Sequence, residues 1–290
     1  MILLLSEIKT LNQVKIKKST TMKNKLILIC ALIGSFSAFA QSDLLITPYR
    51  VVLENGKNIE ELTVANTGKD TARYTISFLQ YKMLSSGKLE KIETAEDSIL
   101  FADKYLRVFP KSVTLAPNEA QMVRLQLKTP PDLAPGEYRS HLYFRSIVDE
   151  KPDMGTEVDT TKIGFQLVPV YGISIPVIIR LGQSTVRASA TDIKMEQVDT
   201  VQMLNCKIER YGTISTFGQL EVEHTSETGV KTILGKVNGI AVYTPLHSRD
   251  LSIPMNIPPT VDVTKGTVVL KYFAKVDGKE IPYFNQTIKL

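Results

Sequence analysis

Cysteine, tryptophan and histidine are scarce in this sequence, and each scarcity argues against a class of function. Among 290 residues there are two cysteines, three histidines and no tryptophan. The histidines, His141, His224 and His247, show neither the i, i+4 spacing of a helical metal site nor a neighbouring cysteine pair. We therefore expect no metal site and no cofactor.

Catalytic motifs are also missing. The sequence has no nucleophile elbow, no glycine-rich phosphate loop and no dinucleotide fingerprint. Its acidic residues fall mainly in turns and at polar positions, which is typical of solvated surface. The paired carboxylates of a glycosidase can lie far apart in sequence, but sandwich domains without tryptophan make a poor sugar-binding cleft. We predict that the chain is not an enzyme.

The folded body has no net charge, although the whole chain carries a formal charge of +5. Residues 1–40 hold six lysines and a single acid, Glu7, and the remainder has equal numbers of basic and acidic residues. A basic patch for nucleic acid or anionic lipid would need an excess that this body does not have. We therefore expect no nucleic-acid partner.

The basic N-terminal region has the form of a secretory signal peptide. Lys23 and Lys25 precede an apolar run, Leu26 to Phe36, which ends at Ala38-Phe39-Ala40. The run is shorter than the roughly 20 residues of a spanning helix, so we favour cleavage after Ala40 over a retained anchor. Export to the periplasm follows, without stable membrane insertion. Met22 is a better start than Met1, and the choice between them stays open.

Cleavage would leave Cys206 as the sole cysteine, because Cys30 lies within the predicted signal peptide. An intramolecular disulfide is then impossible, although export usually permits one. Cys206 lies in an alternating stretch, Met203 to Ile208. We interpret it as a small buried hydrophobe rather than a reactive thiol.

Period-2 alternation recurs along the mature chain and predicts an all-β fold. In one run Tyr138, Ser140, Leu142 and Phe144 alternate with Arg139, His141 and Arg145. Such a pattern is typical of a strand with one face toward a core and the other toward water. Turn sequences such as Asn66-Thr67-Gly68 separate the runs, and we expect no helix longer than a turn or two.

We divide the chain into three parts. Residues 1–40 form an upstream extension and signal peptide, residues 41–181 an N-terminal immunoglobulin-like domain, and residues 182–290 a C-terminal β-sandwich. Gly182-Gln183-Ser184 is the predicted hinge. The polar stretch Asp149 to Lys162 is the longest predicted loop.

Several motifs of the first domain occur in a characteristic order. The opening strand has an arginine before two apolar residues, Arg50-Val51-Val52, and an acidic-glycine turn follows it. The turn Asn66-Thr67-Gly68 comes next. It is followed by the pattern P-x-x-x-x-L-x-P-x-E-x-x-x-V-R-L, at residues 110–125, and by the strand His141-Leu142-Tyr143-Phe144.

In this order and spacing the sequence resembles the periplasmic chaperones of the chaperone–usher pilus pathway, the PapD-like family, over residues 44–181. The resemblance implies two immunoglobulin-like β-sandwich domains in an L-shaped arrangement. It also implies donor-strand complementation, in which the chaperone lends a strand to a pilus or fimbrial subunit that lacks its own last strand. The family needs no ATP for this step.

The resemblance places the donor strand in the run Lys162 to Arg180. The residues expected to take part alternate between the two faces of this strand: Phe165, Leu167, Tyr171, Ile173 and Ile175 on one, and Val168 and Val170 on the other. Any such strand must also pack into its own sandwich. Pro169 and Pro176 lack an N–H, which favours an edge with limited pairing.

Two basic residues of the family anchor the subunit's C-terminal carboxylate. The resemblance assigns one of these roles to Arg50, and the alternative is an arginine of an edge strand that extends to solvent. At the position of the second, a lysine, this chain has Pro176. A single arginine or an unidentified donor must then serve.

The family also has an interdomain ion cluster of two arginines and a glutamate. Arg124 and Arg180 match the arginines, whereas the glutamate position is Arg139. We expect Glu137, two residues earlier on the same face, to replace it.

The resemblance predicts a periplasmic chaperone whose partner is a pilus subunit. The alternative is a secreted structural or adhesive module that shares only the sandwich fold. Exposure to protease on intact cells would distinguish the adhesive module. The sequence leaves open whether an outer-membrane usher is a further partner and whether the free chain caps itself as a dimer.

Overall fold

The computed structural model describes residues 44–94, 98–147 and 170–289. Its regular elements are strands, apart from a single 3-10 turn at Asp103–Tyr105. The predicted signal peptide and the donor residues Phe165, Leu167 and Val168 lie outside the described residues, as does the long polar stretch. In the described part of the chain no helix has the length and apolar character needed to span a bilayer.

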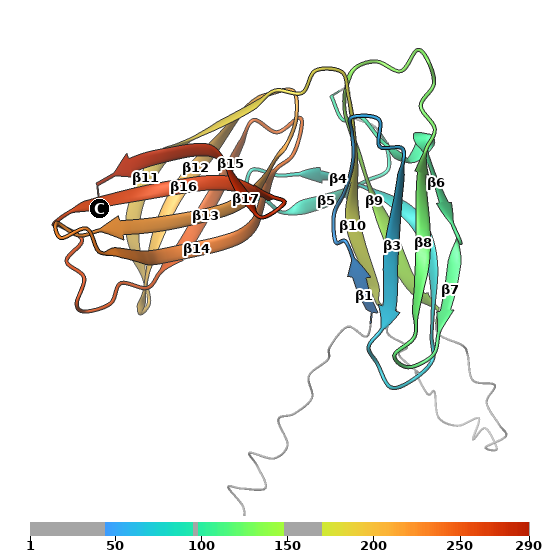
Figure 1. Ribbon diagram of the computed structural model, residues 1–290, viewed down its shortest axis with the longest axis horizontal. Coiled ribbons are helices and arrows are strands. Elements are labelled where there is room, and N and C mark those ends of the chain that lie inside the picture. Colours follow the sequence, from blue (N-terminus) through green and yellow to red (C-terminus); the bar gives the residue numbers. More distant parts are fainter. Residues whose placement is uncertain (1–43, 95–97, 148–169, 290) are drawn as a thin grey trace, which may run out of the picture. The chain divides into compact units, whose positions relative to one another are not determined.

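The first half of the chain forms two β-sheets (Figure 1). One sheet contains, in spatial order, β1 (Leu44–Thr47), β3 (Ile59–Asn66), β8 (Ala120–Leu127) and β6 (Leu106–Phe109). The other contains β2 (Val51–Leu53), β10 (Gly172–Leu181), β9 (Gly136–Ile147), β4 (Ala72–Met83) and β5 (Leu89–Ile92), with β7 (Ser112–Leu115) paired to the start of β4.

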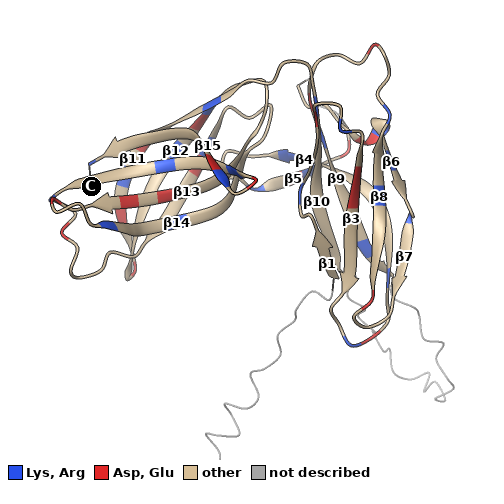
Figure 2. Cartoon of the chain, in the orientation of Figure 1, with Lys and Arg blue, Asp and Glu red and all other residues tan. Residues whose placement is uncertain are grey.

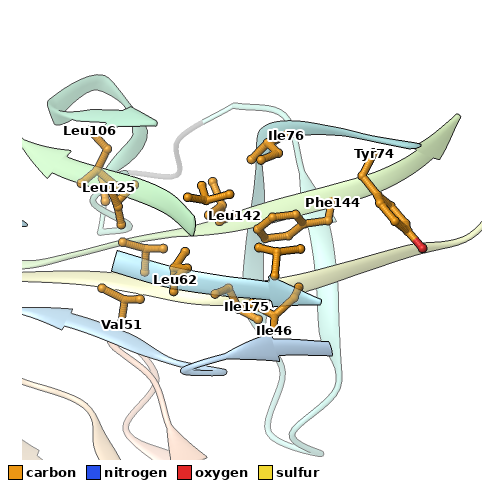
Figure 3. Packing of buried hydrophobic residues seen from close by; sticks show 14 of the residues in the cluster. Ile46, Val51, Leu62, Tyr74, Ile76, Leu106, Leu125, Leu142, Phe144 and Ile175 are labelled. Carbon is orange, nitrogen blue, oxygen red and sulfur yellow. The ribbon is translucent and has the colours of Figure 1, made fainter. Parts of the chain in front are cut away.

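Alternate side chains of these two sheets meet in one hydrophobic core (Figure 3). On β8, Val123, Leu125 and Leu127 are buried while the residues between them are exposed. Tyr138, Leu142 and Phe144 of β9 belong to the same core. The period-2 pattern therefore separates core from solvent on β8, whereas both faces of β9 are buried from Glu137 to Leu142. The prediction of a β-sandwich is confirmed here.

The second half of the chain forms a seven-stranded sheet with a separate core (Figure 1). Its strands, in spatial order, are β11 (Val186–Val198), β12 (Val201–Gly212), β15 (Ser248–Met255), β14 (Lys231–Val242), β13 (Thr216–Thr225), β16 (Thr267–Val276) and β17 (Lys279–Ile288). The backbone N–H of Ala190 on β11 donates to Gln286 on β17, so the two ends of the sheet lie close together.

Cys206 lies within this second core and is a free, buried thiol. Burial raises the pKa of the Cys206 thiol to about 11. The interpretation of this residue as a small hydrophobe is confirmed.

The predicted hinge falls between β10 and β11, where Gly182 adopts a positive φ of 78°. The two large cores share no residue. A third, smaller cluster joins Ile178 of β10 to Ala241 and Tyr243, with Phe217 of β13 packed against it. The boundary at residue 182 remains a prediction.

Candidate functional site

Arg50 lies immediately before β2 and contacts aromatic residues of the second half of the chain. Its Nη1 donates a hydrogen bond of 3.1 Å to the hydroxyl of Tyr243. Its guanidinium carbon is 4.4 Å from the ring centroid of Phe217 and 5.5 Å from that of Tyr243, within the range of cation–π attraction. Arg50 is half-buried, so it is not an arginine that simply extends into solvent. Its role as an anchor remains a prediction.

A second guanidinium lies on the same tyrosine ring. The guanidinium carbon of Arg139, on β9, is 4.0 Å from the ring centroid of Tyr243. Its Nη2 donates to the carbonyl of Tyr81 at 2.9 Å, while its Nη1 is buried without a hydrogen-bond partner. Arg139 is only 4% exposed.

Burial lowers the pKa of Arg139 to about 10. Tyr243 and Glu137 act in the opposite direction, and the positive charge of Arg50 lowers this pKa further. Arg139 therefore remains a cation at neutral pH. A buried donor of this kind leaves hydrogen-bonding capacity that a bound group would satisfy.

His141 lies two residues further along β9, on the same face as Arg139. The side chain is 2% exposed and its Nδ1 also lacks a hydrogen-bond partner. Its ring packs edge-on against Tyr81, with the centroids 4.8 Å apart. Burial lowers the pKa of His141 to about 3, helped by the positive charges of Arg139 and Arg50. The imidazole is therefore neutral at physiological pH.

Glu137 and Arg180 form an ion pair beside this group. Arg180 Nε donates to Glu137 Oε2 at 2.9 Å, and Arg180 Nη1 donates to Glu54 at 3.2 Å. Glu137 also accepts hydrogen bonds from the backbone N–H and the hydroxyl of Ser215 and from the hydroxyl of Thr244. Residues far apart in sequence thus meet at one carboxylate.

Burial by itself raises the pKa of Glu137. The hydrogen bonds from Ser215 and the positive charge of Arg180 outweigh that effect, so this pKa lies below its ordinary value. Glu137 is therefore ionised at neutral pH, and its charge is matched by Arg180.

Arg124 is not part of this network, which corrects the predicted ion cluster. It is an exposed residue on β8, opposite Glu61 on β3 and Phe109 on β6. Glu54 completes the network instead. Sequence reasoning missed Glu54 because its turn sequence, Glu54-Asn55-Gly56, is typical of exposed surface.

One edge of strand β10 is paired along its full length, and the other edge is paired along only part of it. It is antiparallel to β9 over its full length, Gly172–Leu181, but parallel to β2 only at Val177–Ile179. Among the described residues, no strand pairs with this second edge at Gly172–Pro176. That segment therefore offers an open backbone edge.

The side chains of the predicted donor run differ in accessibility. Tyr171 is 67% exposed, and Val170 is exposed as well. Ile173 packs partly buried against the first core, and Ile175 is 4% exposed within it (Figure 3). Ile175 is thus not free to enter a partner's groove, which corrects its assignment as a donor side chain.

The described residues offer little support for other kinds of site. No group of three or more histidine, cysteine or acidic side chains in the described part of the chain is arranged to hold a metal ion. Figure 2 shows basic and acidic residues of both signs spread over the strands of both halves. This distribution differs from the basic stripe of a nucleic-acid interface.

No protein-family model and no curated protein matches the chain. Solved structures with a similar fold include the YadV chaperone, at 9% identity and a TM-score of 0.46, over 85% of this chain and 100% of that one. Another is the class 5 fimbriae chaperone CfaA, at 18% identity and a TM-score of 0.41, over 84% and 98% of the two chains.

A third is the SafB chaperone, determined in complex with the Salmonella enterica SafA pilin. It is 13% identical, with a TM-score of 0.41, over 87% of this chain and 99% of the matched chain. At these identities and TM-scores the matches carry no functional argument, so the residues of this chain must carry it.

Proposed function

We propose that this chain is an exported periplasmic chaperone of the PapD-like type, which binds a pilus or fimbrial subunit by donating a strand. The observation that carries the proposal is the open edge of β10 at Gly172–Pro176. A subunit that lacks its last strand would fit this edge, because its hydrophobic core is exposed and its backbone groups along the groove are unpaired.

Backbone hydrogen bonds to this edge would supply the pairing, and side chains would fill pockets of the subunit. Among the described residues Val170 and Tyr171 are accessible for that purpose. Ile173 and Ile175 instead hold the strand in its own sandwich. The donor thus combines a fixed part inside the first core with an accessible part before it. Phe165, Leu167 and Val168 are proposed as further donor side chains and lie outside the described residues.

Arg50 supplies the second element of the proposal, an anchor for the terminal carboxylate of the bound subunit. Among the described residues it contacts a neutral hydroxyl and two aromatic rings. Its charge is therefore not matched by a described acid. A carboxylate would form charge-assisted hydrogen bonds with this guanidinium.

The proposal is tested by recovery of the subunit from the periplasm of the source organism. Tyr171→Asp places a charge on the donor segment, and Arg50→Ala removes the anchor. Each change is expected to lower the amount of co-purified subunit at least about tenfold, because each removes a central contact. Quantitative mass spectrometry of the purified complex provides the measurement.

Tyr211→Asp and Arg187→Ala are matched controls at exposed positions on β12 and β11, and both are expected to retain wild-type recovery. Undiminished capture by both test variants, at unchanged chaperone yield, would contradict donation through this strand and anchor.

A further inference from the structure

Tyr143 lies across the start of β10, beside the open edge of that strand. It follows His141 by two residues on β9, so its side chain is on the same outer face of the sheet. Its direct partner on β10 is Ser174, and Gly172 is the diagonal neighbour. The Cε2, Cζ and Oη atoms of Tyr143 occupy the position that a Cβ atom on Gly172 would take. The ring therefore covers a residue that has no side chain of its own.

This contact depends on the glycine at position 172. Any other residue there would place its Cβ atom inside the Tyr143 ring and displace the ring. An aromatic side chain can cover a glycine on the next strand because a diagonal cross-strand neighbour lies within its reach. Tyr143 is partly buried and Gly172 is exposed. The phenolic end of the ring thus lies over β10, next to an edge that no described strand covers.

The backbone groups of Gly172 point toward that open edge. The carbonyl of Tyr171 accepts a hydrogen bond of 2.8 Å from the N–H of Ser146 on β9, and the N–H of Tyr171 donates to the Ser146 hydroxyl at 3.0 Å. Successive residues of a strand direct their backbone groups to opposite edges. Gly172 and Ser174 therefore direct theirs away from β9. A strand that pairs with this edge forms hydrogen bonds with the residue under the Tyr143 ring.

We infer that Tyr143 determines which side chain the incoming strand carries beside Gly172, and that it selects a bulky aliphatic one such as isoleucine. This inference rests on the proposed function and names a specificity-determining residue outside the donor strand. Side chains on one face of paired strands lie about 5 Å apart, so the incoming side chain meets the ring. Aromatic and β-branched side chains pack favourably in such cross-strand pairs.

The chemistry of the ring favours an aliphatic contact over a polar one. A bulky aliphatic side chain removes the accessible part of the ring from water and gains apolar contact area. A serine would leave the ring uncovered, and a charged side chain would lose part of its hydration against the ring. Arg145, the direct partner of Gly172 on β9, is exposed. An acidic side chain that pairs with Arg145 is therefore the alternative that the test must exclude.

The test fixes the strand register with a disulfide. Ser174→Cys exchanges an oxygen for a sulfur beside the open edge, and the native Cys206 is buried. The probe is the peptide Lys-Thr-X-Thr-Cys-Thr-X-Thr-Lys with both ends blocked. When its cysteine is joined to residue 174, one X lies beside Gly172 in either strand direction. Thiol exchange at equilibrium, followed by mass spectrometry, gives the relative stability of the adducts with isoleucine, serine or glutamate at X.

With Tyr143 intact, the isoleucine peptide is expected to be favoured over the serine peptide about fivefold, the upper range of a cross-strand pair. Tyr143→Ala should reduce this preference below about twofold, and Tyr143→Phe should keep it because the ring remains. Gly172→Ala should reduce it as well, since Gly172 has no positive φ and the new Cβ only displaces the ring. Added to Tyr143→Ala, it should cause no further loss.

Tyr211→Ala is the matched control, because it removes an exposed tyrosine of the second sheet. It is expected to keep the full preference for isoleucine. Thermal unfolding shows whether each variant is folded, and Gly172→Ala decides the matter if Tyr143→Ala is not. An unchanged preference in the folded variants would overturn the inference, as would a parent protein that favours serine or glutamate at X.

A further set of peptides separates this inference from the proposed function. Isoleucine peptides with N-methyl groups on alternate amides, in each of the two phases, block one set of backbone hydrogen bonds at a time. One phase is expected to weaken the adduct, because its amides pair with β10. If neither phase did so, strand donation itself would fail. If one phase did so and isoleucine had no advantage over serine, only the role of Tyr143 would fail.

Discussion

At the scale of single residues, the outer face of β9 carries three buried ionisable side chains in succession: Glu137, Arg139 and His141. The three side chains differ in how many of their polar atoms have hydrogen-bond partners. The Glu137 carboxylate accepts a full set of hydrogen bonds, Nη1 of the Arg139 guanidinium has no acceptor, and the neutral His141 imidazole has an unpartnered nitrogen. Charge and hydrogen bonding therefore differ from one side chain to the next along this face.

His141 makes the stability of the protein depend on pH. Its folded pKa of about 3 lies below the ordinary 6.5. Below pH 6.5 the unfolded chain therefore binds a proton that the folded chain excludes. This contribution to stability is complete above pH 6.5 and is lost as the pH falls toward 3, by about 1.4 kcal/mol per pH unit.

Urea unfolding at pH 7, 6, 5 and 4 measures this dependence. His141→Phe should lose less stability between pH 6 and pH 4 than the wild type, because a neutral ring takes the place of the imidazole. His247→Gln, at an exposed position, should show the wild-type slope. Equal slopes for His141→Phe and the wild type would contradict the assignment of the buried imidazole.

At the scale of secondary-structure elements, β10 is the informative strand. Its second half, Val177–Ile179, lies between β9 and β2, whereas its first half has β9 on one side only. Ile175 fixes the first half in the core although its outer edge is open. The first half of β10 thus has an accessible backbone edge and is held in the first core by Ile175.

Hydrogen exchange should distinguish the two halves. Amides of Gly172–Ile175 that face away from β9 are expected to exchange at least about a hundredfold faster than those of Val177–Ile179, because they lack a cross-strand acceptor. Exchange followed by mass spectrometry on overlapping peptides measures this difference. Under the proposed function, binding of a subunit should slow exchange only in the first half of β10. Equally slow exchange of both halves in the free protein would show that the edge is covered.

At the scale of the whole molecule, Glu137 ties β9 to residues of the second half of the chain. Its carboxylate accepts hydrogen bonds from Ser215 and Thr244, which are 78 and 107 residues away in sequence. Arg180, in the same network, donates to the carbonyl of Ser215. One buried carboxylate therefore links segments that local interactions do not bring together.

Glu137→Gln is expected to lower the free energy of unfolding by about 3 kcal/mol, since it leaves the mostly buried Arg180 without its main counter-charge. Urea denaturation at pH 7 provides the measurement. Asp192→Asn removes the acid of an exposed ion pair with Lys207 and is expected to leave stability unchanged. A loss as small as that of the control would mean that the network does not stabilise the fold.

Much of the fold could be predicted from local pattern, because alternation and turn residues act over short distances. The same pattern assigned Arg139 and His141 to the face of β9 opposite its core side chains. That face is not in water but buried, with Tyr243 against Arg139. The alternation distinguishes two faces and does not say what covers each.

The partners of the site could not be predicted, since they depend on contacts across the chain. Tyr243 is 193 residues from Arg50, and Ser215 is 78 from Glu137. Family-based alignment likewise placed Arg124 in the ion cluster, whereas the strand register places it on the other sheet of the first sandwich. Packing against distant strands sets the partners of Arg50 and Glu137, and strand register sets the position of Arg124.

The burial of the Cys206 thiol has a consequence for the redox chemistry of the folded chain. With a pKa of about 11, only about one molecule in ten thousand carries the thiolate at pH 7. Oxidants and disulfides react with thiolates, so Cys206 resists forming a mixed disulfide both by burial and by protonation. In the folded chain Cys206 is therefore a poor partner for disulfide exchange.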